Sequence, residues 1–173
     1  TIGWGVFYLL VSLGNKTVVE SDVKKIAQRQ NIIYHRHFTT PTPFNNLLWF
    51  VVLESDKGYY IGHRSVFDRR YNMPLYYFPR NDSLLIPVKD MEDLVDLTKF
   101  SQGYYTVEKW GDTLVFNDLR FGQIIGWKDP DARFTFHYYL QGAYGNDMVV
   151  QRGRFRNWDW AAFRSMMQRI AGR

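Results

Sequence analysis

Seven consecutive apolar residues, LLWFVVL from Leu47 to Leu53, constrain the fold of this chain more than any other segment. A strand with one face in water alternates polar and apolar residues, so an uninterrupted apolar run predicts a strand that is buried on both faces. Such a strand belongs in the centre of a sheet. The sequence Ser-Asp-Lys-Gly at 55–58 then predicts a turn, and Tyr59–Phe67 is expected to form the other half of a hairpin.

Alternation with a period of two indicates further strands. It is clearest around 133–140, where Phe134, Phe136, Tyr138 and Leu140 share one face. A second hairpin is expected around Gly111-Asp112, and the prolines at 41 and 43 should interrupt the ladder because proline donates no hydrogen bond. The remaining predicted strands are Ile32–Thr40, Tyr104–Trp110, Thr113–Asn117, Leu119–Trp127, Phe134–Leu140 and Met148–Arg152.

Three segments show the spacing of an amphipathic helix. They are the N-terminal segment, with a possible break near Gly14, the middle segment Asp90–Phe100, and a C-terminal segment that Asn157 would cap. The apolar stripe predicted for the C-terminal helix consists of Trp160, Phe163, Met167 and Ile170.

Together these segments predict an α+β fold. It would contain one curved, mainly antiparallel sheet of about seven strands, with an N-terminal, a middle and a C-terminal helix. The expected organisation is a helix over residues 1–30 followed by a single α+β domain over residues 31–173.

The N-terminal segment opens with an almost wholly apolar run, Ile2–Leu13. This run is too short to cross a bilayer, which takes about 20 residues. It fits either the end of a longer membrane span or an ordinary core helix, and the residues alone do not decide between them. If the run is membranous, the basic residues Lys24, Lys25 and Arg29 that follow it favour the cytoplasmic side.

Charge and cysteine content narrow the classes of function. The net charge is +5, and the lysines and arginines are spread along the chain, which favours a solvated surface over a nucleic-acid interface. The absence of cysteine excludes disulfides, thiolate metal sites and a cysteine nucleophile. The spaced motifs of zinc proteases, serine hydrolases and phosphate-binding loops do not occur.

A weak metal-binding pattern is His35-x-His37. Two imidazoles two residues apart on a strand point the same way and could bind one ion. His63, Asp68 or Asp118 would have to supply a third ligand. The alternative interpretation is two histidines on a solvated sheet face.

A polar ligand site is a second hypothesis, with Asn45, Asn46, Asp118 and Arg120 as its candidate residues. Asp118 and Arg120 lie two apart on one strand face, where they could form an ion pair or bind a polar ligand. The two asparagines precede the buried strand, where such residues commonly stabilise turns but could also hold a ligand. For both pairs the structural role is favoured over ligand binding.

Three strings of residues resemble a known family. TTPTPFNNLLW at 39–49, GYYIG at 58–62 and FNDLRFG at 116–122 are similar to the bacterial membrane-bound, metal-dependent hydrolases, also described as LexA-binding, inner-membrane-associated hydrolases of the YdjM type. The opening YLLVSLGNK at 8–16 resembles the end of that family's last membrane segment. The resemblance runs from Tyr8 to about Gly122 and extends more loosely to the C-terminal helix.

The resemblance implies a soluble accessory domain on the cytoplasmic side of the bacterial inner membrane. Its partners would be the membrane or upstream transmembrane helices, and those helices would carry the His and Asp ligands of a divalent metal. No cofactor and no catalytic residue is therefore expected in this segment. The alternative function is a non-enzymatic module that binds protein or lipid.

Overall fold

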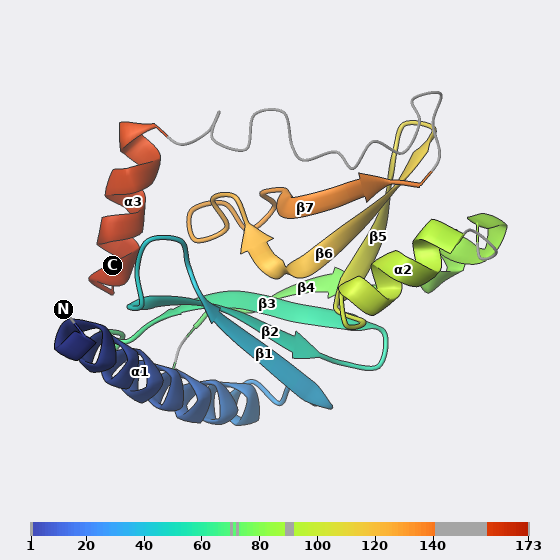
Figure 1. The fold of residues 1–173 in the computed structure, drawn as a ribbon. Helices are drawn as coiled ribbons and strands as arrows, with labels where there is room; N and C mark the ends of the chain where they lie inside the picture. The colour runs from blue at the N-terminus through green and yellow to red at the C-terminus, as the bar shows by residue number, and fades with distance from the viewer. Residues whose placement is uncertain (1, 70, 72, 89–91, 141–158, 173) are drawn as a thin grey trace.

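The strands form two stacked antiparallel sheets in the computed structural model, which describes residues 2–69, 71, 73–88, 92–140 and 159–172 (Figure 1). The first sheet has four strands in the order β1-β2-β3-β4: Arg36–Pro41, Leu48–Glu54, Gly58–Ser65 and Tyr76–Pro79. The second has three strands in the order β5-β6-β7: Tyr105–Trp110, Thr113–Gln123 and Phe134–Tyr139. The α+β class is confirmed, and the prediction of one curved sheet is wrong.

The division into two sheets follows from the segment between β4 and β5. A 3₁₀ helix, η1 (Asp82–Val88), and the helix α2 (Glu92–Phe100) occupy it, so β5 does not continue the first sheet beside β4. Instead β5 pairs with β6, and the second sheet packs face to face on the first. Alternation along a strand predicts which side chains share a face, but not which strands share a sheet.

The burial of β2 confirms its predicted central position. Odd-numbered Trp49, Val51 and Leu53 pack against the helix α1 (Ile2–Arg29) on one face of the sheet. Even-numbered Phe50 and Val52 pack against the second sheet on the other face. The apolar run is therefore needed because β2 has a helix on one side and a sheet on the other.

The helix α1 is continuous through Gly14, so the expected break is absent. Its second half belongs to the core, with Val19, Val23 and Ile26 fully buried against the first sheet. Its first half extends past the edge of that sheet (Figure 1). The helix thus has two halves with different surroundings.

The boundaries of several other elements differ from the prediction. β6 is one strand from Thr113 to Gln123 rather than two, and a register shift between Asp118 and Gln123 absorbs the irregularity, with Gly122 in the left-handed region. The predicted middle helix is present as α2, whereas η1 before it was not predicted. The expected strand Met148–Arg152 and the expected cap Asn157 lie outside the described residues.

The C-terminal helix α3 (Trp160–Ile170) begins one residue after Asp159, whose side chain accepts a hydrogen bond from the backbone N–H of Ala162. Its buried residues are Ala162, Met166 and Ile170, so the predicted stripe is wrong except at its last position. The helix has two apolar stripes, and the one that packs against Leu48 is not the one with the larger aromatic side chains.

Candidate functional site

Exposed apolar side chains from four separate segments gather at one end of the molecule, which we call the apolar end. The start of α1, the β1–β2 turn and α3 all lie at this end, as do both termini of the chain drawn in Figure 1. The exposed residues of the apolar end are Val6, Phe7, Tyr8, Leu9, Leu10, Val11 and Leu13 of α1, Phe44, Phe67, and Trp160, Phe163 and Met167 of α3.

The first half of α1 is apolar on every side. From Val6 to Val11 every side chain is apolar and exposed, by 38% at Val11 and 63% at Leu10. Successive residues of an α-helix are about 100° apart, so six in a row cover the whole circumference. A helix that binds in a groove needs one apolar face only, whereas this segment has no polar face to leave in water.

The β1–β2 turn connects α1 to α3. Asn45 holds the turn through its Oδ1 atom, which accepts hydrogen bonds from the backbone N–H groups of Leu47 and Leu48 at 2.9 and 2.8 Å. The carbonyl oxygen of Asn46 accepts a bond from Asn15 of α1 at 3.0 Å. Phe44, at the tip of the turn, is 84% exposed with a φ of 64°. The two candidate asparagines thus have structural contacts in this turn.

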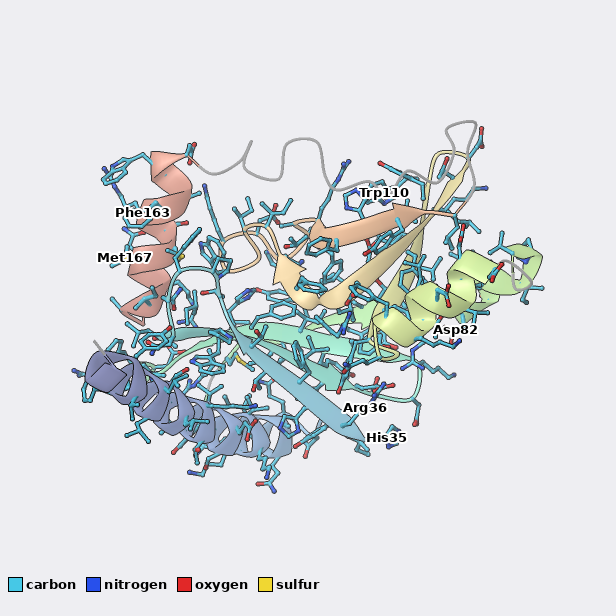
Figure 2. The ribbon with its side chains drawn as sticks, in the orientation of Figure 1. His35, Arg36, Asp82, Trp110, Phe163 and Met167 are labelled. Carbon is cyan, nitrogen blue, oxygen red and sulfur yellow. The ribbon has the colours of Figure 1, made fainter. Side chains whose placement is uncertain are left out.

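The helix α3 is fixed on the other side of the same turn. Met166 and Ile170 pack against Leu47 and Leu48, and the hydroxyl of Ser65 donates to the carbonyl of Ile170 at 2.5 Å. Figure 2 shows Phe163 and Met167 on the side of α3 that points away from the sheets. The outer stripe also contains Trp160, whose ring stacks on Phe163 with centroids 5.5 Å apart.

A network of four charges fixes α1 and α3 relative to β3. Arg64 of β3 is 2% exposed and bonds Asp22 of α1 at 2.8 Å. Arg64 also pairs with Asp68 at 3.4 Å, and Asp68 pairs with Arg169 of α3 at 2.7 Å. Removing one partner from such a network leaves a buried charge uncompensated, so the network holds the two helices in a defined arrangement.

The two histidines of the metal hypothesis have separate contacts. β1 begins only at Arg36, and the His35 imidazole pairs with Asp56 in the β2–β3 turn. The His37 ring lies edge-on to Tyr34, with centroids 5.8 Å apart. Within the residues that the structure describes, no group of three or more His, Cys, Asp or Glu side chains could hold a metal ion.

The other candidate pair forms an internal ion pair on β6. Arg120 donates from Nη2 to Asp118 Oδ2 at 2.8 Å and from Nε to Asp118 Oδ1 at 3.1 Å. Asp118 is completely buried, and the Arg120 guanidinium also lies 4.8 Å from the centre of the Phe100 ring. Asn45 and Asn46 lie in the β1–β2 turn on the first sheet, so the four polar candidates belong to two places in the fold.

Two features of this part of the structure were not predicted from the sequence. The outer stripe of α3 and Phe44 at the tip of the turn become part of one surface only through tertiary contacts. A cavity next to Glu108 and Trp110 was also missed, because its lining comes from four separate segments. The alternation of Thr106, Glu108 and Trp110 on one strand face is the signal that could have drawn attention to it.

Comparison with known proteins does not place the chain in a family. No family model, no curated protein and no solved structure matches it. Among the described residues, no helix has both the length and the apolar content needed to cross a membrane.

Proposed function

We propose that this chain is a membrane-attached accessory domain, with the first half of α1 embedded in an apolar environment and the two sheets held beside it. The observation that carries the proposal is the apolar circumference of α1 from Val6 to Val11. Lipid, or a bundle of membrane helices, can cover a helix on all sides. In water the apolar circumference of α1 would stay exposed to solvent.

The dimensions fit entry into a bilayer rather than a crossing by this segment alone. Ile2–Leu13 is about 18 Å long at about 1.5 Å per residue, against about 30 Å for the hydrocarbon core of a bilayer. The segment therefore reaches about halfway on its own, or forms the end of a longer span.

The outer stripe of α3 supports the same arrangement. Trp160, Phe163 and Met167 face outward at the apolar end, and Arg164 is exposed beside them. An amphipathic helix with aromatic residues on one face and basic residues beside them suits the interface between lipid and water. Tryptophan in particular is enriched at that level.

The parent protein that we propose is a membrane-bound, metal-dependent hydrolase of bacteria. Support comes from the resemblance of TTPTPFNNLLW, GYYIG and FNDLRFG to that family. The first of these strings forms the β1–β2 turn, which bonds α1 through Asn46 and packs on α3 through Leu47. In this proposal the chain does not carry the catalytic metal. It positions upstream membrane helices, on the cytoplasmic side of the inner membrane.

Flotation with vesicles of phosphatidylethanolamine and phosphatidylglycerol tests membrane attachment. Replacing Phe7 and Leu10 together by serine should lower the partition coefficient at least tenfold, because burying one such side chain contributes about 2 kcal/mol. The control variant replaces Ile33 and Ile86 by serine. These side chains are 82% and 67% exposed, and they do not belong to the apolar end. Equal flotation of both variants and the parent chain would exclude this role for α1.

The hydrolase part of the proposal has a separate test. The coding sequence upstream of Thr1 should encode several hydrophobic spans with His and Asp motifs. If it encodes none, the chain is not part of such a hydrolase, although the flotation result still decides whether it binds membranes.

A further inference from the structure

A cavity of about 230 Å³ lies between the edge of the first sheet and one face of the second. Phe78 of β4 and Phe134 of β7 supply its apolar walls, with ring centroids 5.5 Å apart. Glu108, Trp110 and Asn117 line it from β5 and β6. Because a water molecule takes about 30 Å³, this space holds about eight waters or a small organic molecule.

The carboxylate of Glu108 has a fixed orientation in this cavity. Its Oε1 atom accepts a hydrogen bond from Asn117 Nδ2 at 2.9 Å, and its Oε2 atom accepts one from the Trp110 indole N–H, also at 2.9 Å. Asn117 is itself 1% exposed and is within 3.3 Å of the Thr106 hydroxyl. Both donors to Glu108 are neutral, and no Lys or Arg forms an ion pair with it in the described part of the chain.

Two further charged residues line the cavity, Asp131 and Arg133, and both are exposed. The Arg133 guanidinium lies 4.3 Å from the centre of the Trp110 ring, over its face. Glu108 is held at the N–H edge of the same indole, and no ion pair joins the two among the residues described. Trp110, labelled in Figure 2, therefore contacts both the Glu108 carboxylate and the Arg133 guanidinium.

The neighbouring histidine does not neutralise Glu108. The His137 ring is 5.1 Å from the Trp110 ring and is 5% exposed. Burial is the main cause that lowers the pKa of His137, and Arg133 lowers it further, while the Phe134 carbonyl and Glu108 act in the opposite direction. The imidazole is therefore uncharged near neutral pH and adds no cation to the cavity.

We propose that this cavity binds a small zwitterion of the amino-acid type. Its ammonium group would bind the oriented Glu108 carboxylate, and its carboxylate would bind Arg133. The apolar part of the ligand would lie against the Phe78 and Phe134 rings. A ligand with both charges can pair with Glu108 and with Arg133, whereas a ligand with one charge makes only one of these two contacts.

This inference is independent of membrane attachment. The cavity residues belong to β4, β5, β6, β7 and the loop before β7, and none of them is part of the apolar end. Loss of vesicle binding would leave the ligand experiment unaffected, and the reverse also holds.

Isothermal titration calorimetry on the full chain tests the proposal with L-alanine, L-leucine and L-methionine as probes. At least one should bind with a Kd below 1 mM, a scale set by two charged contacts in a small pocket. For L-leucine, the matched probes are 3-methylbutylamine, which lacks the carboxylate, and 4-methylpentanoate, which lacks the ammonium group. Each should bind at least tenfold more weakly than L-leucine.

Two variants assign the charges to residues. Glu108→Gln and Arg133→Gln should each weaken binding at least tenfold, whereas the exposed controls Glu92→Gln and Arg164→Gln should not. Circular dichroism of each variant checks that it is folded. The comparison of L-leucine with 3-methylbutylamine and 4-methylpentanoate uses the parent chain alone, so it does not depend on the folding of any variant. Absence of binding by all three amino acids up to 10 mM, or equal affinity for the amine and the amino acid, overturns the proposal.

Discussion

At the scale of single residues, the burial of His63 couples the stability of the fold to pH. Its side chain lies on the face of β3 that meets the second sheet, with its ring 5.3 Å from the Phe50 ring and 6.3 Å from the Trp127 ring. Burial, and to a lesser extent the nearby Arg169, lower the pKa of His63 to about 3. The native state therefore holds this imidazole in its neutral form across the physiological range.

The pKa of a histidine in an unfolded chain is about 6.5. Between about pH 6.5 and about pH 3, His63 is therefore protonated in the unfolded state but not in the native state. The stability that His63 contributes is complete above about pH 6.5 and falls as the pH drops toward about 3. Between pH 7 and pH 5 the loss should be about 2 kcal/mol. Urea unfolding of the parent chain and of His63→Leu at the two pH values measures it, because the leucine variant lacks this contribution.

One outcome would contradict the assignment of this pH dependence to His63. If His63→Leu loses as much stability between pH 7 and pH 5 as the parent chain does, the buried imidazole is not the group responsible.

At the scale of elements, two glycines differ in whether the structure has room for a Cβ atom at their position. A Cβ atom at Gly62 of β3 would lie 2.5 Å from the backbone carbonyl oxygen of Pro74, which cannot move away as a flexible side chain could. A Cβ at Gly14 of α1 would meet nothing within 4 Å. The first glycine is needed for close packing of two backbone segments, and the second only lowers the helix propensity of α1.

Alanine at the two positions should therefore change the stability in opposite directions. Gly62→Ala should lower the free energy of unfolding by about 1–3 kcal/mol through overpacking. Gly14→Ala should raise the helix content of α1 and stabilise it by about 0.5–1 kcal/mol. Circular dichroism and chemical unfolding of the two variants measure both effects. A stable Gly62→Ala variant would mean that β3 and the Pro74 segment are not in close contact.

The elements themselves could largely be predicted from the sequence, whereas their partners could not. The apolar run of β2 and the turn at 55–58 act locally, so the first hairpin was predicted with nearly its observed boundaries. The choice between the two stripes of α3 is not local. Met166 and Met167 are equally apolar, and only the contact with Leu48 decides which of them is buried. The division into two sheets was missed for the same reason.

At the scale of the whole molecule, the layers produce two distinct ends. α1, the first sheet and the second sheet are stacked through two apolar clusters, and a third cluster joins η1 and α2 to the second sheet. Consecutive antiparallel strands place their turns alternately at opposite ends. The β1–β2 turn therefore lies at the apolar end and the β2–β3 turn at the other, as Figure 1 shows. The cavity and the apolar end both depend on such juxtapositions, which no local pattern in the sequence encodes.

The proposed membrane attachment predicts an orientation that can be measured directly. The chain contains no cysteine, so one introduced thiol can be labelled without removing others. Leu10→Cys, Phe44→Cys and Met167→Cys place an environment-sensitive fluorophore on three segments of the apolar end. Lys57→Cys places it on the exposed β2–β3 turn at the opposite end, as the control.

On addition of anionic vesicles, the emission of the label at residue 10 should shift to the blue most, because α1 enters the hydrocarbon region. The labels at 44 and 167 should shift less, since a turn and an amphipathic helix reach only the interface. The label at 57 should not shift. The Asn15–Asn46 hydrogen bond and the Asp22–Arg64 ion pair hold α1 to the rest of the domain. If the domain binds as one rigid body, the turn and α3 must therefore reach the same membrane surface as α1. A shift at residue 10 alone would mean instead that α1 binds lipid as a flexible tether.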